Sequence, residues 1–228
     1  MWWDRIIVIL LSIPGMILYF SFRGFFQALV AKKLGDTMPE RNGFLTMNPL
    51  AHINPFGFLL ILLVGFGFGK PVQFDPSCYK HPKRDGAIQI LSAPLAGIIV
   101  GLALYTFYFI FYVIGHYSGI LSNDFYHYFM LIFLYGFHIA ISLTVFHLLP
   151  LPGLDTYRLV VNFLPYRIYR KFFFIEKYSF WIYIAFLLIL RTPVVGDFLV
   201  KYLLTIPSNA IIWLLSRPFA GLAMLLNI

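Results

Sequence analysis

Arg23 and Asp155 are charged residues in positions where charge is costly, and the chemistry open to them is ion pairing. Arg23 interrupts an apolar run from Ile6 to Ala31, and Asp155 follows the apolar run Phe125–Leu154 after a proline-rich break. A buried carboxylate needs a compensating group, and charges inside membranes tend to face the bundle interior and to pair. We therefore predict an ion pair between Arg23 and Asp155. The alternative is that Arg23 extends to the membrane interface or contacts backbone carbonyls.

His138 and His147 precede Asp155 on the same predicted helix, so the three residues suggest an alternative zinc site. Nine residues at about 100° each place the two imidazoles about 180° apart around the helix, which argues against a shared metal. No Glu lies nearby to act as a base. We favour hydrogen-bonded polar residues in a packed helix over metal ligands.

The composition is that of an integral membrane protein. Of the 228 residues 61% are hydrophobic and 11% are charged, against about 25% charged in soluble domains. The runs Gly86–Asn123 and Phe125–Leu154 contain no Asp, Glu, Lys or Arg, and each exceeds the roughly 20 residues that cross a bilayer. Further apolar stretches are Ile6–Ala31, Tyr178–Leu190 and Tyr202–Ser216. We expect an all-α polytopic membrane protein, with about five or six membrane segments in one membrane domain, 1–228.

The placement of Lys and Arg predicts the orientation. They gather in three loops, whereas the connection Tyr117–Asp124 has none. The positive-inside rule makes the basic loops cytoplasmic and that connection external. Arg23 then lies about two to three turns inside the cytoplasmic end of its helix, at a depth similar to that of Asp155. The net charge of +8 reflects this topology and anionic membrane lipid, and no nucleic-acid partner is expected.

The segment between Lys32 and Asp85 has basic ends and a short apolar middle, Pro55–Gly69. Its four glycines each weaken a helix by about 1 kcal/mol. We therefore expect a small re-entrant β element that enters and leaves by the cytoplasmic face. Such backbone is tolerated at depth only when it is buried in protein or lines a wet cavity, so this element should pack against the site.

Four motifs in order carry a resemblance to a known family. They are Ala31 with Leu34-Gly35-Asp36, the stretch Met47–Gly57 (MNPLAHINPFG), Gly67–Val72 (GFGKPV) and His147–Thr156 (HLLPLPGLDT). With them the chain resembles the site-2 protease family of intramembrane zinc metalloproteases, particularly its compact bacterial branch. The resemblance implies a site-2-protease-like core over 1–158, then a basic cytoplasmic loop and C-terminal membrane segments over 159–228. It also implies a bacterial cytoplasmic membrane.

The departures from this family fall on its chemistry. In its H-E-x-x-H motif two His bind zinc and the Glu activates a water. Counting back from the L-G-D motif places Arg23 at the first His, Gly24 at the Glu and Gln27 at the second His. Arginine cannot give up its proton, glycine offers no base, and glutamine offers only a weak oxygen ligand. Of the family's ligand set only Asp155 remains, so we expect no catalytic residues and no cofactor.

The glycine-rich stretch that the resemblance covers suggests a second feature. In the family a strand-like edge at this place is thought to pair with an unwound substrate segment. Here it would consist of Gly65, Gly67, Gly69 and Lys70, whose glycines permit close approach. This edge could bind a partner, or it could only pack.

These observations favour a non-catalytic protein, a site-2-protease-like pseudoprotease. It would bind another membrane protein or transmembrane segment, or serve as a subunit of a membrane complex. One alternative is a divergent intramembrane zinc metalloprotease with relocated ligands, the one case in which zinc is expected. The other alternative is a small transporter or channel component with Arg23 and Asp155 in a polar pathway.

Overall fold

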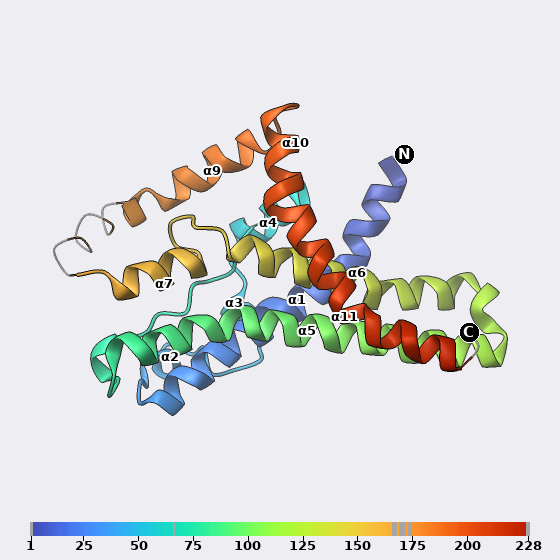
Figure 1. Ribbon diagram of the computed structural model, residues 1–228, viewed down its shortest axis with the longest axis horizontal. Coiled ribbons are helices and arrows are strands. Elements are labelled where there is room, and N and C mark those ends of the chain that lie inside the picture. The colour runs from blue at the N-terminus through green and yellow to red at the C-terminus, as the bar shows by residue number, and fades with distance from the viewer. Residues whose placement is uncertain (1, 66, 166–167, 169–171, 173–174, 227–228) are drawn as a thin grey trace.

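The computed structural model is helical (Figure 1). It describes residues 2–65, 67–165, 168, 172, 175–226, and the bounds given below refer to these. The helices and helical turns are α1 (Trp2–Leu34), α2 (Met38–Arg41), α3 (Pro49–His52), α4 (Pro55–Val64), η1 (Pro76–Cys78), α5 (Pro82–Ser118), η2 (Ile120–Ser122), α6 (Asp124–His147), α7 (Asp155–Phe163), α9 (Ser179–Ile189), α10 (Val195–Leu199), the π-helical η3 (Val200–Thr205) and α11 (Ile206–Leu225).

Four helical stretches are long and apolar enough to cross a membrane. They are Ile6–Leu34, Pro82–Ser118, Asp124–His147 and the continuous run Val195–Leu225. The chain is therefore an integral membrane protein with fewer long spans among the described residues than the five or six expected. The difference lies in α9, which has 11 residues. At 1.5 Å per residue it extends about 16 Å, roughly half of a bilayer core.

The prediction of a β element is wrong, because no strand forms in the described residues and Pro55–Val64 is helix α4. The residues that cap α4 explain the difference. The side chain of Asn54 accepts hydrogen bonds from the backbone N–H groups of Phe56 and Gly57, and Pro55 occupies the first helical position. Gly65 ends the helix in the left-handed conformation, with φ 91°. These start and stop signals outweigh the glycine within the helix.

Two hydrogen bonds to α3, rather than strand pairing, hold the extended chain after α4 in place. The backbone N–H of Lys70 donates to the carbonyl of His52 at 2.7 Å, and its Nζ donates to the carbonyl of Leu50 at 2.8 Å. This stretch therefore lies along α3, beside the centre of the molecule.

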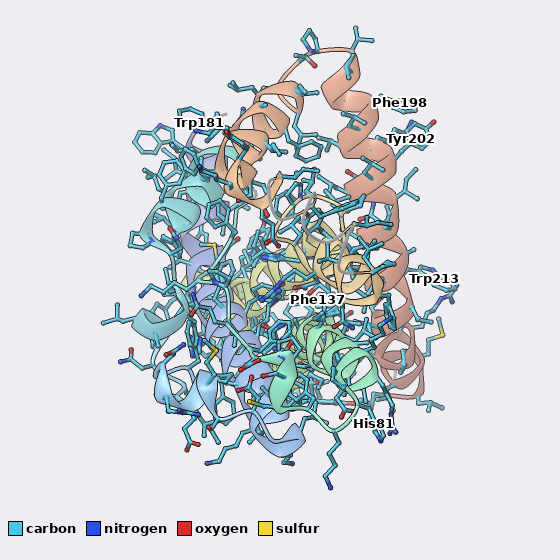
Figure 2. The ribbon with its side chains drawn as sticks, turned by 90° about the vertical axis from the view of Figure 1, so that its left-hand side faces the viewer. His81, Phe137, Trp181, Phe198, Tyr202 and Trp213 are labelled. Atoms are coloured by element: carbon cyan, nitrogen blue, oxygen red, sulfur yellow. The ribbon has the colours of Figure 1, made fainter. Side chains whose placement is uncertain are left out.

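Helices α1, α5 and α6 pack against one another and hold the core. Met16, Tyr19 and Phe137 are among the buried side chains of its main cluster. Figure 2 places Phe137 in the middle of the molecule, whereas Trp213 lies on its outside and is 57% exposed. Such outward aromatic groups suit a lipid-facing surface.

The two ends of this bundle differ. In Figure 1 the end of α1, the start of α5 and α7 lie at one end of the long axis. The α5–α6 connection and the end of α11 lie at the other, where the Tyr117 hydroxyl donates to the carbonyl of Leu226 at 3.0 Å. The basic residues at the end of α1 and those at the start of α5 thus lie at the same end of the bundle, as the charge distribution predicts for a common membrane side.

Helices α1 and α6 cross at Gly15 and Gly136. A Cβ added at Gly136 would lie 3.1 Å from the Cα of Gly15, and a Cβ at Gly15 would overlap the backbone of Gly136. Small residues of this kind let membrane helices approach closely.

We expect Gly15→Val to force α1 away from α6 and to destabilise the protein by about 1–3 kcal/mol, the usual cost of overpacking. Thermal unfolding in detergent measures this change. Gly221→Val is the matched control, because a Cβ at Gly221 meets nothing within 4 Å. Equal melting temperatures for the two variants would contradict the tight crossing.

Candidate functional site

An ion pair between α1 and α7 forms the centre of the candidate site. Arg23 Nη2 lies 2.6 Å from Asp155 Oδ1, and the two side chains are 10% and 4% exposed. The structure thus brings together the two charged residues that the sequence analysis paired. The interaction joins residues 132 positions apart in the chain, so it also fixes α7 against the bundle.

The loop before α7 positions Asp155. Leu148 ends α6, Gly153 turns the chain with φ 86°, and Asp155 is the first residue of α7. The Thr156 hydroxyl donates to the carbonyl of Leu148 at 2.7 Å, and the Tyr183 hydroxyl of α9 donates to the carbonyl of Pro152. A carboxylate in the first turn of a helix also benefits from the helix dipole.

The ion pair leaves two buried atoms without partners. Arg23 Nε and Asp155 Oδ2 have no hydrogen-bond partner in the described part of the chain. Both amide atoms of Gln27, which is fully buried one turn after Arg23, also lack a partner among the described residues. Buried polar atoms are normally satisfied, so each exception requires an explanation.

A neighbouring imidazole ring fills the space beside the Cα atom of Gly24. A Cβ at Gly24 would overlap the imidazole of His52. The Nε2 atom of that imidazole lies 2.7 Å from the carbonyl oxygen of Thr46, which holds the ring in place. Its buried Nδ1 has no partner among the described residues. Burial lowers the pKa of His52, with the Lys70 charge adding to the shift and the Thr46 carbonyl opposing it. Residue 24 therefore faces a neutral, fixed imidazole.

His147 lies in the site, but His138 does not complete a metal site with it. His147 Nδ1 is 2.7 Å from the carbonyl of Leu143 and 3.5 Å from the Tyr19 hydroxyl. Residues of the site's cavity include His147 and Asp155 but not His138. Among the residues that the structure describes, no three His, Cys, Asp or Glu side chains gather as metal ligands would.

A cavity of about 170 Å³ opens beside the ion pair. Besides Arg23, His147 and Asp155 it is lined by residues of the extended segment, the α6–α7 loop, α7 and α9: Phe68, Gly69, Lys70, Pro71, Gly153, Leu154, Arg158, Ser179 and Tyr183. Arg158, Ser179 and Tyr183 are absent from the site predicted from the sequence. Arg158 follows Asp155 by three residues on one helix, a spacing that predicts a shared face.

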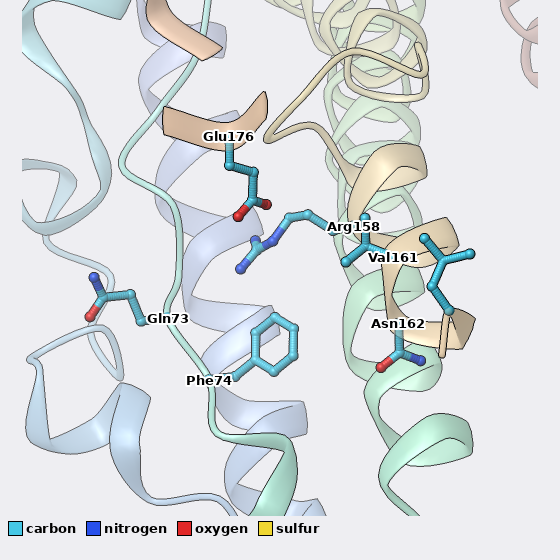
Figure 3. Close-up of a pocket in the computed structure, with 7 residues that line it drawn as sticks. Gln73, Phe74, Arg158, Val161, Asn162 and Glu176 are labelled. Atoms are coloured by element: carbon cyan, nitrogen blue, oxygen red, sulfur yellow. The ribbon is translucent and has the colours of Figure 1, made fainter. Parts of the chain in front are cut away.

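A second, larger cavity of about 430 Å³ shares Arg158 with the first (Figure 3). Gln73, Phe74, Asn162 and Glu176 also line it. Arg158 Nη2 donates to the carbonyl of Val72 at 2.9 Å, and the guanidinium carbon lies 4.9 Å from the centre of the Phe74 ring. Burial raises the pKa of Glu176, and the Arg158 charge opposes that shift.

The glycines of the proposed partner-binding edge have packing roles. Gly65 ends α4, Gly67 lies against the Gly57 carbonyl, and a Cβ at Gly69 would lie 2.7 Å from the Phe20 ring. Of the four residues proposed, only Gly69 and Lys70 line the cavity.

Two curated proteins are similar to the chain. A Bacillus subtilis (strain 168) protein named "Putative zinc metalloprotease YwhC" is 31% identical over 212 residues, which are 91% of each chain. A Mycolicibacterium smegmatis (strain ATCC 700084 / mc(2)155) protein named "Putative zinc metalloprotease Rip2" is 29% identical over 159 residues, 66% of this chain and 56% of the relative. No protein-family model matches the chain, and no solved structure matches it.

We expect Arg23→Met to destabilise the protein by about 3–5 kcal/mol, because it leaves the Asp155 carboxylate buried and unpaired. The double variant Arg23→Met/Asp155→Leu removes both charges and should recover most of that loss. Unfolding by sodium dodecyl sulfate in mixed micelles measures each difference.

Lys32→Met is the matched control for this prediction. Lys32 Nζ and Glu40 Oε1 are also 2.6 Å apart, but their side chains are 44% and 40% exposed. Such a pair contributes about 0–1 kcal/mol. Equally small effects of Arg23→Met and Lys32→Met would show that the buried pair does not stabilise the bundle.

Proposed function

Because the chain belongs to the site-2 protease family of intramembrane zinc metalloproteases, we propose that it is a non-catalytic member, a pseudoprotease that binds a segment of another membrane protein. The observation that carries this proposal is the Arg23–Asp155 ion pair. A guanidinium occupies the place beside the carboxylate where the resemblance puts the metal.

The side chains of the site do not fit zinc. Zinc in proteins is bound by Cys, His, Asp or Glu. In the described part of the chain no three such side chains lie close enough together to hold a metal ion. Arg23 stays protonated and repels a cation. A general base at residue 24 would have to displace the His52 imidazole. The same facts argue against relocated ligands at His138 and His147.

Binding without cleavage is consistent with what the site retains. The cavity, the fixed α6–α7 loop and the extended segment at Gly69 and Lys70 are all present beside the ion pair. A fold can keep a binding surface after its reaction is lost, because function depends on the site and not on the fold. The partner we propose is a membrane polypeptide, since the site lies among membrane-spanning helices.

We expect the purified full chain to contain far less than one zinc per molecule, because its donor set cannot hold the ion. Elemental mass spectrometry after purification without chelators measures the content. Arg23→His/Gln27→His is the matched variant: it restores two imidazoles four residues apart on α1, and with Asp155 they supply three zinc ligands. We expect this variant to gain zinc. One equivalent of zinc in the wild-type protein would contradict this proposal and support a divergent zinc metalloprotease.

We expect a photo-crosslinking amino acid at Ser179, which lines the cavity, to yield a discrete protein adduct in native membranes. The same group at Met224, which is 78% exposed and lies in the last turn of α11, serves as the control. Mass spectrometry of the purified adducts identifies the partner. Identical adduct patterns at both positions would indicate random collisions and contradict a binding site at the cavity.

A further inference from the structure

The cavity beside the ion pair carries an excess of positive charge. Among the residues that the structure describes, Arg23, Lys70 and Arg158 line it together with one carboxylate, that of Asp155. Arg23 is paired with Asp155. Within the described residues neither Lys70 nor Arg158 has a carboxylate oxygen within 4.0 Å. Glu176 lines the larger cavity but not this one.

Backbone carbonyls hold Lys70 and Arg158 in place, and the Glu176 carboxylate lies on the side of Arg158 that faces the larger cavity. Lys70 Nζ donates to the carbonyl of Leu50 at 2.8 Å, and Arg158 Nη2 donates to the carbonyl of Val72 at 2.9 Å. Lysine has three N–H donors and arginine has five, so one carbonyl does not exhaust either group. Both side chains are thus positioned by the fold and can still donate to an anion in the cavity.

The unpartnered atoms of the ion pair add a second requirement for a ligand. Arg23 and Asp155 are 8% and 3% exposed, and their atoms Nε and Oδ2 lack partners among the described residues. Leaving such atoms unsatisfied costs free energy. A ligand that satisfies the site must therefore bring negative charge and acceptor atoms for the cations, together with an N–H or O–H donor for Asp155 Oδ2.

These requirements distinguish between anions. A phosphodiester group brings charge and acceptors, and any donor of a lipid headgroup, such as a phosphatidylglycerol hydroxyl, is separated from it by a carbon chain. The last residue of a polypeptide brings a carboxylate and, on the carbon that bears it, an amide N–H. The larger cavity adjoins the smaller one at Arg158 and gives the preceding residues of such a polypeptide a place to lie. Figure 3 shows the Arg158 guanidinium reaching across that cavity towards the segment with Gln73 and Phe74.

We propose that the cavity binds the C-terminal carboxylate of a polypeptide. Lys70 and Arg158 donate to the carboxylate, and the terminal amide N–H donates to Asp155 Oδ2. This inference rests on the proposed function, because it requires a site that binds a polypeptide without cleaving it.

The experiment uses the full chain in nanodiscs and a pentaalanine peptide labelled with fluorescein at its N-terminus, prepared with a free C-terminal carboxylate or as the C-terminal amide. Fluorescence anisotropy measures both dissociation constants. We expect the free acid to bind at least about ten-fold tighter, because the amide lacks the charge that strengthens these hydrogen bonds. Lys70→Gln and Arg158→Gln should each abolish most of that preference. Lys33→Gln, at an exposed lysine outside both cavities, should retain it.

The other outcomes separate the possibilities. Equal binding of acid and amide, or a preference that survives Lys70→Gln and Arg158→Gln, overturns the inference. Inorganic phosphate or phosphatidylglycerol that binds through Lys70 and Arg158, with no preference for the free-acid peptide, assigns the site to a phosphate group and also overturns it. In both cases a zinc-free protein that leaves the peptide intact preserves the proposed function. Cleavage of the peptide together with bound zinc overturns the proposed function itself.

Discussion

Charge buried within a membrane protein must be neutralised by a partner that the fold holds in place, and this constraint organises the structure around Arg23 and Asp155. Arg23 belongs to the first helix, and Asp155 follows the third long helix after a sharp loop. Neither group can be desolvated alone without a large cost. Their contact therefore ties the loop, α7 and α1 into one unit, and this unit forms part of the wall of the cavity beside the pair.

The elements around the pair meet at short distances because small residues and caps permit it. Gly15 and Gly136 bring α1 and α6 together, and Gly67 lies directly on α4 at Gly57. Caps decide where the short helices stop, and so where the extended segment with Lys70 begins. This close packing places Arg23 beside Asp155 and brings Lys70 and Arg158 to the same cavity.

The sequence allowed the depth of Arg23 and Asp155 to be estimated, because the distribution of Lys and Arg sets the membrane sides and helix rise sets the distances. The prediction for Pro55–Val64 is wrong. Its glycine content favours a β element, but the end signals at Asn54, Pro55 and Gly65 define a helix. The sequence predicts about five or six membrane segments, whereas four long spans are found among the described residues, because α9 is apolar but short. Arg158 is absent from the site predicted from the sequence, because the start of α7 at Asp155 is fixed by loop contacts that no local pattern displays.

The position of the His52 imidazole against Gly24 couples two segments that are distant in the chain. A Cβ at residue 24 would overlap that ring, so a larger residue there requires the imidazole to move. The ring is held in turn by the carbonyl of Thr46, which lies 2.7 Å from its Nε2. A change on the first helix is therefore transmitted to the loop before α3, and the two segments respond to substitution as one unit.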